Sequence, residues 1–244
     1  MKVNVLTHIG IVRKENQDSV VFELFESKNR AIAVVCDGMG GARAGSVASS
    51  LAVESFMEEM RPVLNSPKRI TGLKEKLIAA AVKSNSVVFE SSKSTVDYQG
   101  MGTTLVALFR DGSKYFVINI GDSRAYHING KKAARITRDH SFVEELVDRG
   151  ELTPEQARVH PRKNIITRAL GIAAEVQCDV FDGSLKKGEY IMLCSDGLTN
   201  LVFQEELSVL FEKYKEPELI CKELVDLAIE RGAPDNVTVA VLSL

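Results

Sequence analysis

The chain has 244 residues, a hydrophobic content of 45% and a charged content of 26%, which are typical of a globular protein with a sizeable core. Its formal net charge of −2 gives no electrostatic reason to expect nucleic acid or an anionic membrane as a partner. No stretch approaches the length that spans a bilayer, and MKVNVLTHIG lacks the apolar core of a signal peptide. The cysteines occur singly in apolar surroundings, as reduced core residues do. We therefore expect a cytoplasmic protein.

Apolar patterning predicts strands and then helices in the first part of the chain. Strands are expected over Val3–Leu6, Ser19–Phe25 and Arg30–Cys36, the last two joined by a turn at 26–29. Amphipathic helices are expected over Gly45–Met60, where Pro62 should end the helix, and over Leu73–Phe89.

The second part of the chain continues with mostly hairpin-linked strands. Strands are expected over Thr103–Phe109, Lys114–Ile120, Ala125–Ile128, Val176–Phe181, Tyr190–Cys194 and 237–244. Asp111-Gly112 is the clearest hairpin turn. Helices are expected over Phe142–Arg149, from Thr153-Pro154 onward, and over Gln204–Tyr214 and Pro217–Arg231. This order predicts one domain of antiparallel sheet with helices outside it.

The run AIAVVCDGMGG, residues 31–41, is the most informative stretch. A buried strand ends at Asp37, and a glycine-rich turn follows that can approach a ligand closely. A hard cation or a phosphate suits such a site, although Asp-Gly is also an ordinary turn pair. If the strands before and after residues 26–29 pair, Asp18 and Asp37 are almost equidistant from the turn and meet side by side.

Three further aspartates share this relation to strand ends. Asp122 and Asp196 follow strands as Asp37 does, whereas Asp235 precedes a strand as Asp18 does. Because strand directions alternate in an antiparallel sheet, all five can share one rim, where their repulsion requires cations. All-oxygen ligation favours magnesium, manganese or calcium over zinc.

Two such ions, bridged by one aspartate, would activate a water for in-line attack on phosphorus. Arg13, five residues before Asp18, is suited to hold phosphate oxygens, although a lone surface arginine is often only solvated. The sequence lacks the Cys-x5-Arg, DxDxT, GxSxG and GxxxxGK[ST] patterns of covalent phosphatases, hydrolases and nucleotide-binding loops.

Seven motifs in this order resemble those of the metal-dependent PP2C-type (PPM) protein phosphatases, in particular the compact bacterial members. They are RKENQD (13–18), VVCDGMGG (34–41), GMGTT (100–104), INIGDSRAY (118–126), TRDHS (137–141), LCSDGL (193–198) and PDNVTV (234–239). The resemblance implies an α+β fold over 1–244, a four-layer α-β-β-α sandwich of two antiparallel sheets flanked by helix pairs. It also implies a flap subdomain at about 141–165.

The resemblance also implies roles for the site residues and the cofactor, which would be Mn²⁺ or Mg²⁺. Asp37 would bridge two core ions and the Gly38 carbonyl would bind one of them, while Asp196 and Asp235 would complete the other ion's ligands. Asp122 would hold a third, weaker ion together with Asp196. Asp18 would act through water, and Arg13 would clamp the phosphate. The expected catalytic residues are thus Arg13, Asp37 and Asp196.

Two departures from the family pattern concern the proton donor to the leaving group. Relatives often have a histidine where this chain has Met39 or Ala42, so that role is open. Basic flap residues suggest a preference for acidic phosphoproteins; they are Arg158, Arg162, Lys163 and Arg168.

We therefore expect a phosphoserine/phosphothreonine protein phosphatase that opposes a bacterial Hanks-type kinase. It would work as a monomer, with a metal-bridging water or hydroxide as nucleophile. The alternatives are a phosphatase of small phosphate esters and a catalytically weak pseudophosphatase that binds phosphoproteins as a regulatory module.

Overall fold

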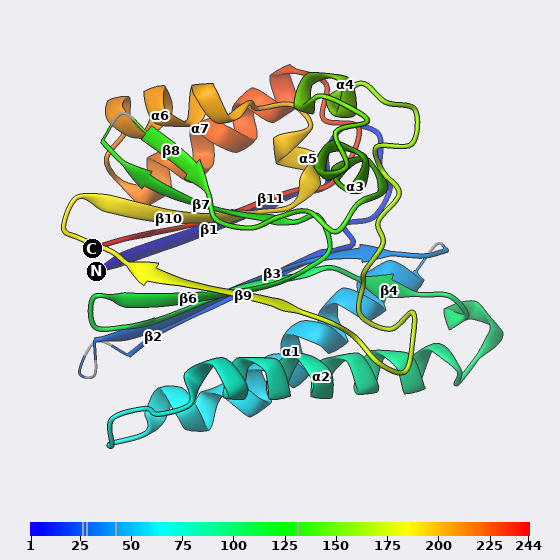
Figure 1. Cartoon of the computed structure of the whole chain (residues 1–244), viewed down its shortest axis with the longest axis horizontal. Helices are drawn as coiled ribbons and strands as arrows, with labels where there is room; N and C mark the ends of the chain where they lie inside the picture. The colour runs from blue at the N-terminus through cyan, green and yellow to red at the C-terminus, as the bar shows by residue number, and fades with distance from the viewer. Residues whose placement is uncertain (26, 28, 42, 131) are drawn as a thin grey trace.

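Two antiparallel sheets pack face to face between two pairs of helices in the computed structural model, which describes residues 1–25, 27, 29–41, 43–130 and 132–244 (Figure 1). The strand order is β1-β11-β10-β7-β8 in one sheet and β2-β3-β5-β6-β9 in the other, with β4 paired to the end of β3. Helices α1 and α2 cover the second sheet, and α6 and α7 cover the first. The predicted four-layer sandwich is confirmed.

The elements have the following bounds. The strands are β1 (Lys2–His8), β2 (Asp18–Phe25), β3 (Arg30–Met39), β4 (Gly102–Thr103), β5 (Leu105–Asp111), β6 (Lys114–Ile120), β7 (Arg124–Asn129), β8 (Lys132–Arg135), β9 (Asp179–Ser184), β10 (Glu189–Cys194) and β11 (Val237–Ser243). The helices are α1 (Ala44–Asn65), α2 (Leu73–Ser92), α3 (Phe142–Asp148), α4 (Pro154–Arg158), α5 (Asp196–Thr199), α6 (Gln204–Lys213) and α7 (Pro217–Glu230).

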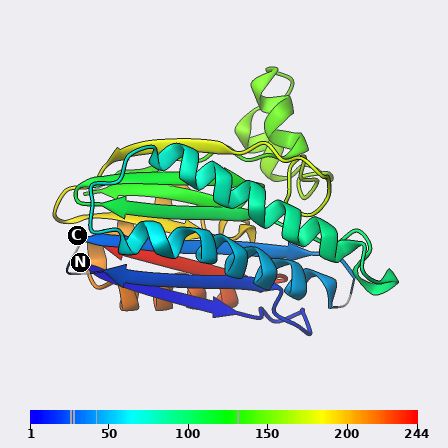
Figure 2. The ribbon, with the colours of Figure 1, turned by 90° about the horizontal axis from the view of Figure 1, so that it is seen from below.

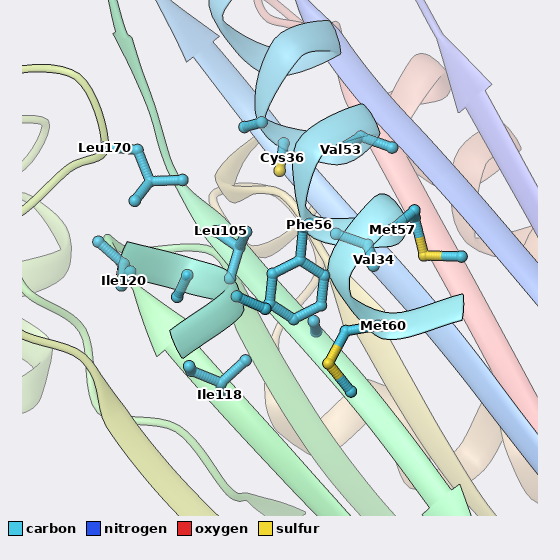
Figure 3. Close-up of a cluster of buried hydrophobic side chains, with 14 of the residues drawn as sticks. Val34, Cys36, Val53, Phe56, Met57, Met60, Leu105, Ile118, Ile120 and Leu170 are labelled. Atoms are coloured by element: carbon cyan, nitrogen blue, oxygen red, sulfur yellow. The ribbon is translucent and has the colours of Figure 1, made fainter. Parts of the chain in front are cut away.

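Strand β3 is apolar along most of its length because both of its faces are buried. Ala31, Ala33 and Val35 point into the layer between the sheets, whereas Ile32 and Val34 point toward α1 and α2. Phe56 of α1 lies at the centre of the helix-side layer, in contact with the sheet side chains shown in Figure 3. The core therefore holds the end of β3, where Asp37 lies, between two packed layers.

The expectation that Pro62 ends the first helix is wrong. Helix α1 continues through Pro62 to Asn65, because Leu64 is fully buried and the helix end is capped from outside. The guanidinium of Arg30 donates to the backbone carbonyl oxygens of Leu64 at 3.2 Å and Ser66 at 2.6 Å. These bonds satisfy carbonyls at the helix end and offset the proline's disruption of the last turn.

Other differences concern short or edge elements. Strand β9 begins at Asp179, later than expected, because Val176 and Cys178 pack against the helix-side core before pairing with β6 starts. Strands β4 and β8 and helix α5 were not predicted. The expected turn at 26–29 includes residues 26 and 28, which lie outside the described residues. The Asp111-Gly112 hairpin is confirmed, with Asp111 opposite Lys114.

Within the described residues, no helix is both long and apolar enough to cross a membrane. All four cysteines are free, and Cys36, Cys194 and Cys221 are buried, as expected of reduced core residues.

Replacing Phe56 by alanine should lower the free energy of unfolding by about 3–5 kcal/mol, because the ring is fully buried and its removal leaves a cavity. Urea unfolding followed by circular dichroism measures this loss. The matched control is Val96→Ala, since Val96 is 85% exposed and its replacement should change stability by less than about 0.5 kcal/mol. Equal losses in the two variants would contradict this description of the core.

Candidate active site

Asp18 and Asp37 lie directly opposite each other on the neighbouring strands β2 and β3. This register confirms the arrangement expected from their distances to the turn. The carboxylate of Asp18 is buried: its Oδ2 accepts hydrogen bonds from Ser195 Oγ at 2.8 Å and Thr238 Oγ1 at 2.6 Å. Its other oxygen, Oδ1, is buried without a hydrogen-bond partner among the described residues.

Burial and mutual repulsion raise the pKa of several carboxyl groups at this rim. For Asp18 the pKa rises to about 7, mainly through desolvation, against the two hydroxyl hydrogen bonds. Desolvation likewise raises the pKa of Asp37, with the charges of Asp18 and Asp196 adding to it. The pKa of Asp122 is raised by desolvation and by the charge of Asp196.

Asp196 is the point at which the carboxylates meet. It follows β10 at the start of α5, and burial followed by the charge of Asp235 raises its pKa. Hydrogen bonds with Asp37 and Asn200 partly offset this rise. Asn200 Nδ2 donates to Asp196 Oδ2 at 3.0 Å from one helical turn later. Five aspartates from both sheets are therefore electrostatically coupled at one end of the sandwich.

Arg13 is held at the same rim by Asp235. Its guanidinium NH2 donates to Asp235 Oδ2 at 2.8 Å, and this bond together with the nearby aspartates raises the pKa of Arg13. Asn236 fixes the two loops relative to each other, because its side-chain amide donates to the carbonyls of Ile9 and Glu15. Arg13 is half exposed and faces the carboxylates, as a phosphate-binding group would.

Close backbone approaches at two glycines bring the loops together. A side chain on Gly197 would lie 1.9 Å from the carbonyl oxygen of Asn236, and one on Gly38 would lie 2.0 Å from the carbonyl oxygen of Gly45. Only glycine fits at either position. The Gly38 carbonyl oxygen lies beside Gly45 in the first turn of α1, and its role as a metal ligand stays a prediction.

Buried hydroxyl groups connect Asp37 to the turn that carries Asp122. Thr104 Oγ1 accepts the backbone N–H of Asp37 at 2.9 Å and lies 2.7 Å from Ser123 Oγ. On the other side of this turn, His140 Nδ1 accepts the backbone N–H of Gly121 at 3.1 Å. Thr104, Ser123 and His140 therefore act through hydrogen bonds at strand ends, which fix the backbone on both sides of this turn.

The donor set fits divalent cations with oxygen ligands. In the described part of the chain, no group of three or more His, Cys, Asp or Glu side chains is placed so that it could hold a metal ion. Magnesium and its analogues do not need one, because they keep several waters and bind through one or two carboxylates. The unpartnered Oδ1 of Asp18, beside Asp37, is where a cation-held water would satisfy a buried acceptor.

Met39 and Ala42 stand in the glycine-rich turn at positions where relatives often have a histidine. The Met39 side chain reaches toward Gly102 on β4, where a side chain on Gly102 would lie 2.8 Å from its terminal methyl carbon. Met39 thus supplies a packing contact and no proton donor at this position. Ala42 lies outside the described residues.

Comparison with known proteins identifies the family to which this site belongs. A family model described as Protein phosphatase 2C matches residues 11–218. The chain belongs to the protein phosphatase 2C family. It is 36% identical over 245 residues to the serine/threonine phosphatase stp of Listeria monocytogenes, covering 99% of this chain and 95% of that protein.

Solved structures of this family have the same fold. The Mycobacterium tuberculosis serine/threonine phosphatase PstP/Ppp superposes with a TM-score of 0.89 at 34% identity, covering 100% of this chain and 98% of that one. The family is metal-dependent, and a structure of the PstP catalytic domain is in complex with two manganese ions. That structure matches with a TM-score of 0.85 at 34% identity, over 98% of this chain and 96% of that chain.

Two residues of this phosphatase-family site were not singled out from the sequence. Asn236 was noted only as part of PDNVTV, yet it ties together the loops that carry Arg13 and Asp235. Asn200 lies outside the motifs but binds Asp196. Its position four residues after Asp196 was the available signal, because residues four apart face each other on a helix.

Next to the carboxylates, a cavity of about 690 Å³ extends beneath α3 and α4. These helices project from the sandwich in Figure 2, and their segment is closed at its base by a bridge between Ser141 and Ile166. Asp122 and Asp196 line this cavity together with residues of α4 and Phe203. We use "flap" for residues 141–165.

The raised pKa of Asp18 predicts a specific pH dependence of stability without metal. Between the unfolded-state pKa near 4 and the folded-state value of about 7, only the folded state holds the proton, so the free energy of unfolding falls as pH rises through this window. With excess chelator, the free energy of unfolding of the wild type should fall by about 2 kcal/mol more than that of Asp18→Asn when the pH is raised from 5 to 8.

Urea unfolding at several pH values measures this difference. Asparagine retains an oxygen that can accept hydrogen bonds from Ser195 and Thr238, so the variant tests the charge and not the contacts. If the free energy of unfolding changed with pH in the same way for both proteins, this would contradict a buried Asp18 carboxyl group with a raised pKa.

Proposed function

We propose that this chain hydrolyses phosphoserine and phosphothreonine in proteins with the help of divalent cations. One observation carries the proposal: the loops of both sheets converge so that the charges of Asp37 and Asp196 act on each other amid Asp18, Asp122 and Asp235, with Arg13 paired to Asp235 beside them. The relatives named as serine/threonine phosphatases, which match over almost the whole chain, support the same conclusion.

Each residue of the rim would have a definite role. Asp37, Asp196 and Asp235 would hold the core ions, with the Gly38 carbonyl as an additional ligand. Asp122 would hold a third ion together with Asp196.

Asp18 has a distinct position, because its Oδ2 is occupied by two hydroxyl groups and only Oδ1 remains available. It would therefore orient a water through one oxygen. Arg13 would bind the phosphoryl oxygens and so place phosphorus opposite the attacking water.

When bound, the ions polarise the phosphoryl oxygens and increase the acidity of water at the rim. The oxygen donor set suits both Mn²⁺ and Mg²⁺, and we propose two core ions of either kind. The chain's contribution is to hold the donors fixed: the Thr104 hydroxyl fixes the backbone of Asp37, and Asn200 fixes the carboxylate of Asp196.

The leaving-group oxygen must receive a proton. Neither expected histidine position provides one, so we propose that water at the rim does. Poor leaving groups such as the serine alkoxide depend on this proton more than aryl leaving groups do, because the alkoxide is the stronger base. The ratio of peptide to aryl phosphate turnover therefore reports on this step.

The alternatives are less well supported. A pseudophosphatase would be expected to lack ligands, whereas all five aspartates remain and converge. The flap and its cavity provide a larger surface beside the rim than a small phosphate ester needs, which favours a protein substrate.

Further aspects of the biological role are proposals from the sequence. We infer that the substrates are phosphorylated proteins and that a serine/threonine kinase opposes the enzyme. A monomeric state, a cytoplasmic location and the absence of nucleic-acid or membrane partners stay predictions.

Phosphate release from a phosphothreonine peptide tests the proposed function. With Mn²⁺ the wild type should turn over, whereas excess chelator should abolish activity and Asp196→Asn should lower it by at least about 100-fold, because a shared ligand is lost. The control Asp182→Asn changes an exposed carboxylate on β9 and should leave activity unchanged.

Two results would contradict the proposal. Turnover that persists in excess chelator would exclude a metal-assisted reaction. A folded wild type that binds Mn²⁺ but releases no phosphate would instead support the phosphoprotein-binding module.

A further inference from the structure

Four basic side chains line the cavity beneath the flap, and three of them lie next to carboxylates that balance their charge. Arg124 donates to Asp139 at 2.6 Å, and Arg135 pairs with Glu144. Arg158 stacks on the ring of Phe203 and lies 4.0 Å from Glu205. A second carboxylate, Glu155, also lies near Arg158, and the charge of Arg158 contributes to lowering the pKa of Glu155 after the hydrogen bonds that Glu155 accepts. The fourth is Lys163, and in the described part of the chain no carboxylate forms an ion pair with it.

The position of Lys163 places its charge beside the rim. Its ammonium donates to Asn200 Oδ1 at 3.1 Å, and the same amide donates to Asp196 Oδ2 at 3.0 Å. The flap cation is thus linked to a rim carboxylate through one neutral side chain. Lys163 is half buried and lines the cavity, so a group that enters the cavity beside the rim meets it.

The other basic residues of the flap region do not share this position. Arg162 lies over the ring of Phe142 at 3.7 Å and does not line the cavity. Arg168 pairs with Asp179 at 3.2 Å, away from the cavity wall. The sequence suggests that four basic residues together favour acidic proteins. In the structure, only Lys163 among them is placed to do so.

The walls of the cavity are suited to a peptide segment. Besides the ion pairs, they include the apolar side chains of Val143, Val159, Val202 and Phe203, of which Val159 and Phe203 are exposed. Such walls cover the backbone and aliphatic parts of a bound segment, while an uncompensated cation selects its charge. Because Asp122 and Asp196 of the rim also line this cavity, the residues next to the phosphorylated one would extend into it, advancing about 3.3–3.6 Å per residue.

We propose that Lys163 is a specificity-determining residue, which selects phosphoprotein substrates with an acidic side chain within two residues of the phosphorylated residue. This inference rests on the proposed function, because it requires the phosphate to sit at the aspartate rim. The occupant of the cavity is the substrate segment beside the phosphorylated residue, and its carboxylate replaces Asn200 as the partner of the Lys163 ammonium.

A set of phosphothreonine peptides tests the proposal. In each peptide a single glutamate stands at one of the four positions within two residues of phosphothreonine, and the matched peptide has glutamine there. With Mn²⁺ and low salt, glutamate at one position should raise kcat/KM about three- to five-fold over glutamine. The ratio should approach one at high salt, because the ion pair is screened.

Variants then assign the effect to Lys163. In Lys163→Met the glutamate preference should disappear, and in Lys163→Glu it should reverse in favour of a lysine-containing peptide. Arg162→Met is the matched control, since it removes the neighbouring charge outside the cavity and should retain the full preference. Turnover of p-nitrophenyl phosphate should change less than two-fold in all three variants, which also shows that they fold.

Three outcomes would overturn the proposal while leaving the proposed function intact, because peptides would still be dephosphorylated. The first is equal kcat/KM for glutamate and glutamine at every position. The second is an equal loss of preference in Arg162→Met, which would indicate a general effect of flap charge. The third is a parallel loss of p-nitrophenyl phosphate turnover in Lys163→Met, which would place Lys163 on the reacting phosphate. Absence of turnover with every peptide would instead refute the proposed function.

Discussion

Carboxylates that are brought together in a partly dehydrated site repel one another, and the functional end of this protein is built on that repulsion. The charges of Asp18, Asp37, Asp122, Asp196 and Asp235 act on one another and, together with burial, raise the pKa of most of the group. Such an arrangement stores unfavourable energy, which a cation relieves and which a folded scaffold must overcome. We therefore propose that the rim binds cations for the same reason that it destabilises the metal-free fold.

The sandwich supplies the rigidity that this arrangement requires. Strand β3 is packed on both faces, so Asp37 cannot move away from Asp18 on the neighbouring strand. Around the rim, neutral hydrogen-bonding groups fix each acidic element: Thr104 holds the backbone of Asp37, Asn236 ties the Arg13 loop to that of Asp235, and Asn200 holds Asp196. Because these groups are uncharged, they fix the geometry without cancelling the negative charge that attracts cations.

Much of this arrangement could be predicted from residue order, and the exceptions have physical reasons. Equal spacing from a hairpin turn places Asp18 opposite Asp37, since a register follows directly from such spacing. The extension of α1 past Pro62 could not be predicted, because it depends on a cap from Arg30, which is distant in sequence. Likewise, Lys163 and Arg162 carry the same charge but lie next to different groups. The pattern of basic residues in the sequence does not show which carboxylates lie beside each of them.

We propose that Asp37 is shared by two cations at the rim, and electron paramagnetic resonance of bound Mn²⁺ tests this central proposal most directly. Titration of the metal-free wild type should reveal two Mn²⁺ ions whose spins are coupled, because a shared carboxylate holds them close together. In folded Asp37→Asn the coupled signal should be lost. A wild type that binds only isolated ions, or an Asp37→Asn variant that keeps the coupled pair, would contradict the claim.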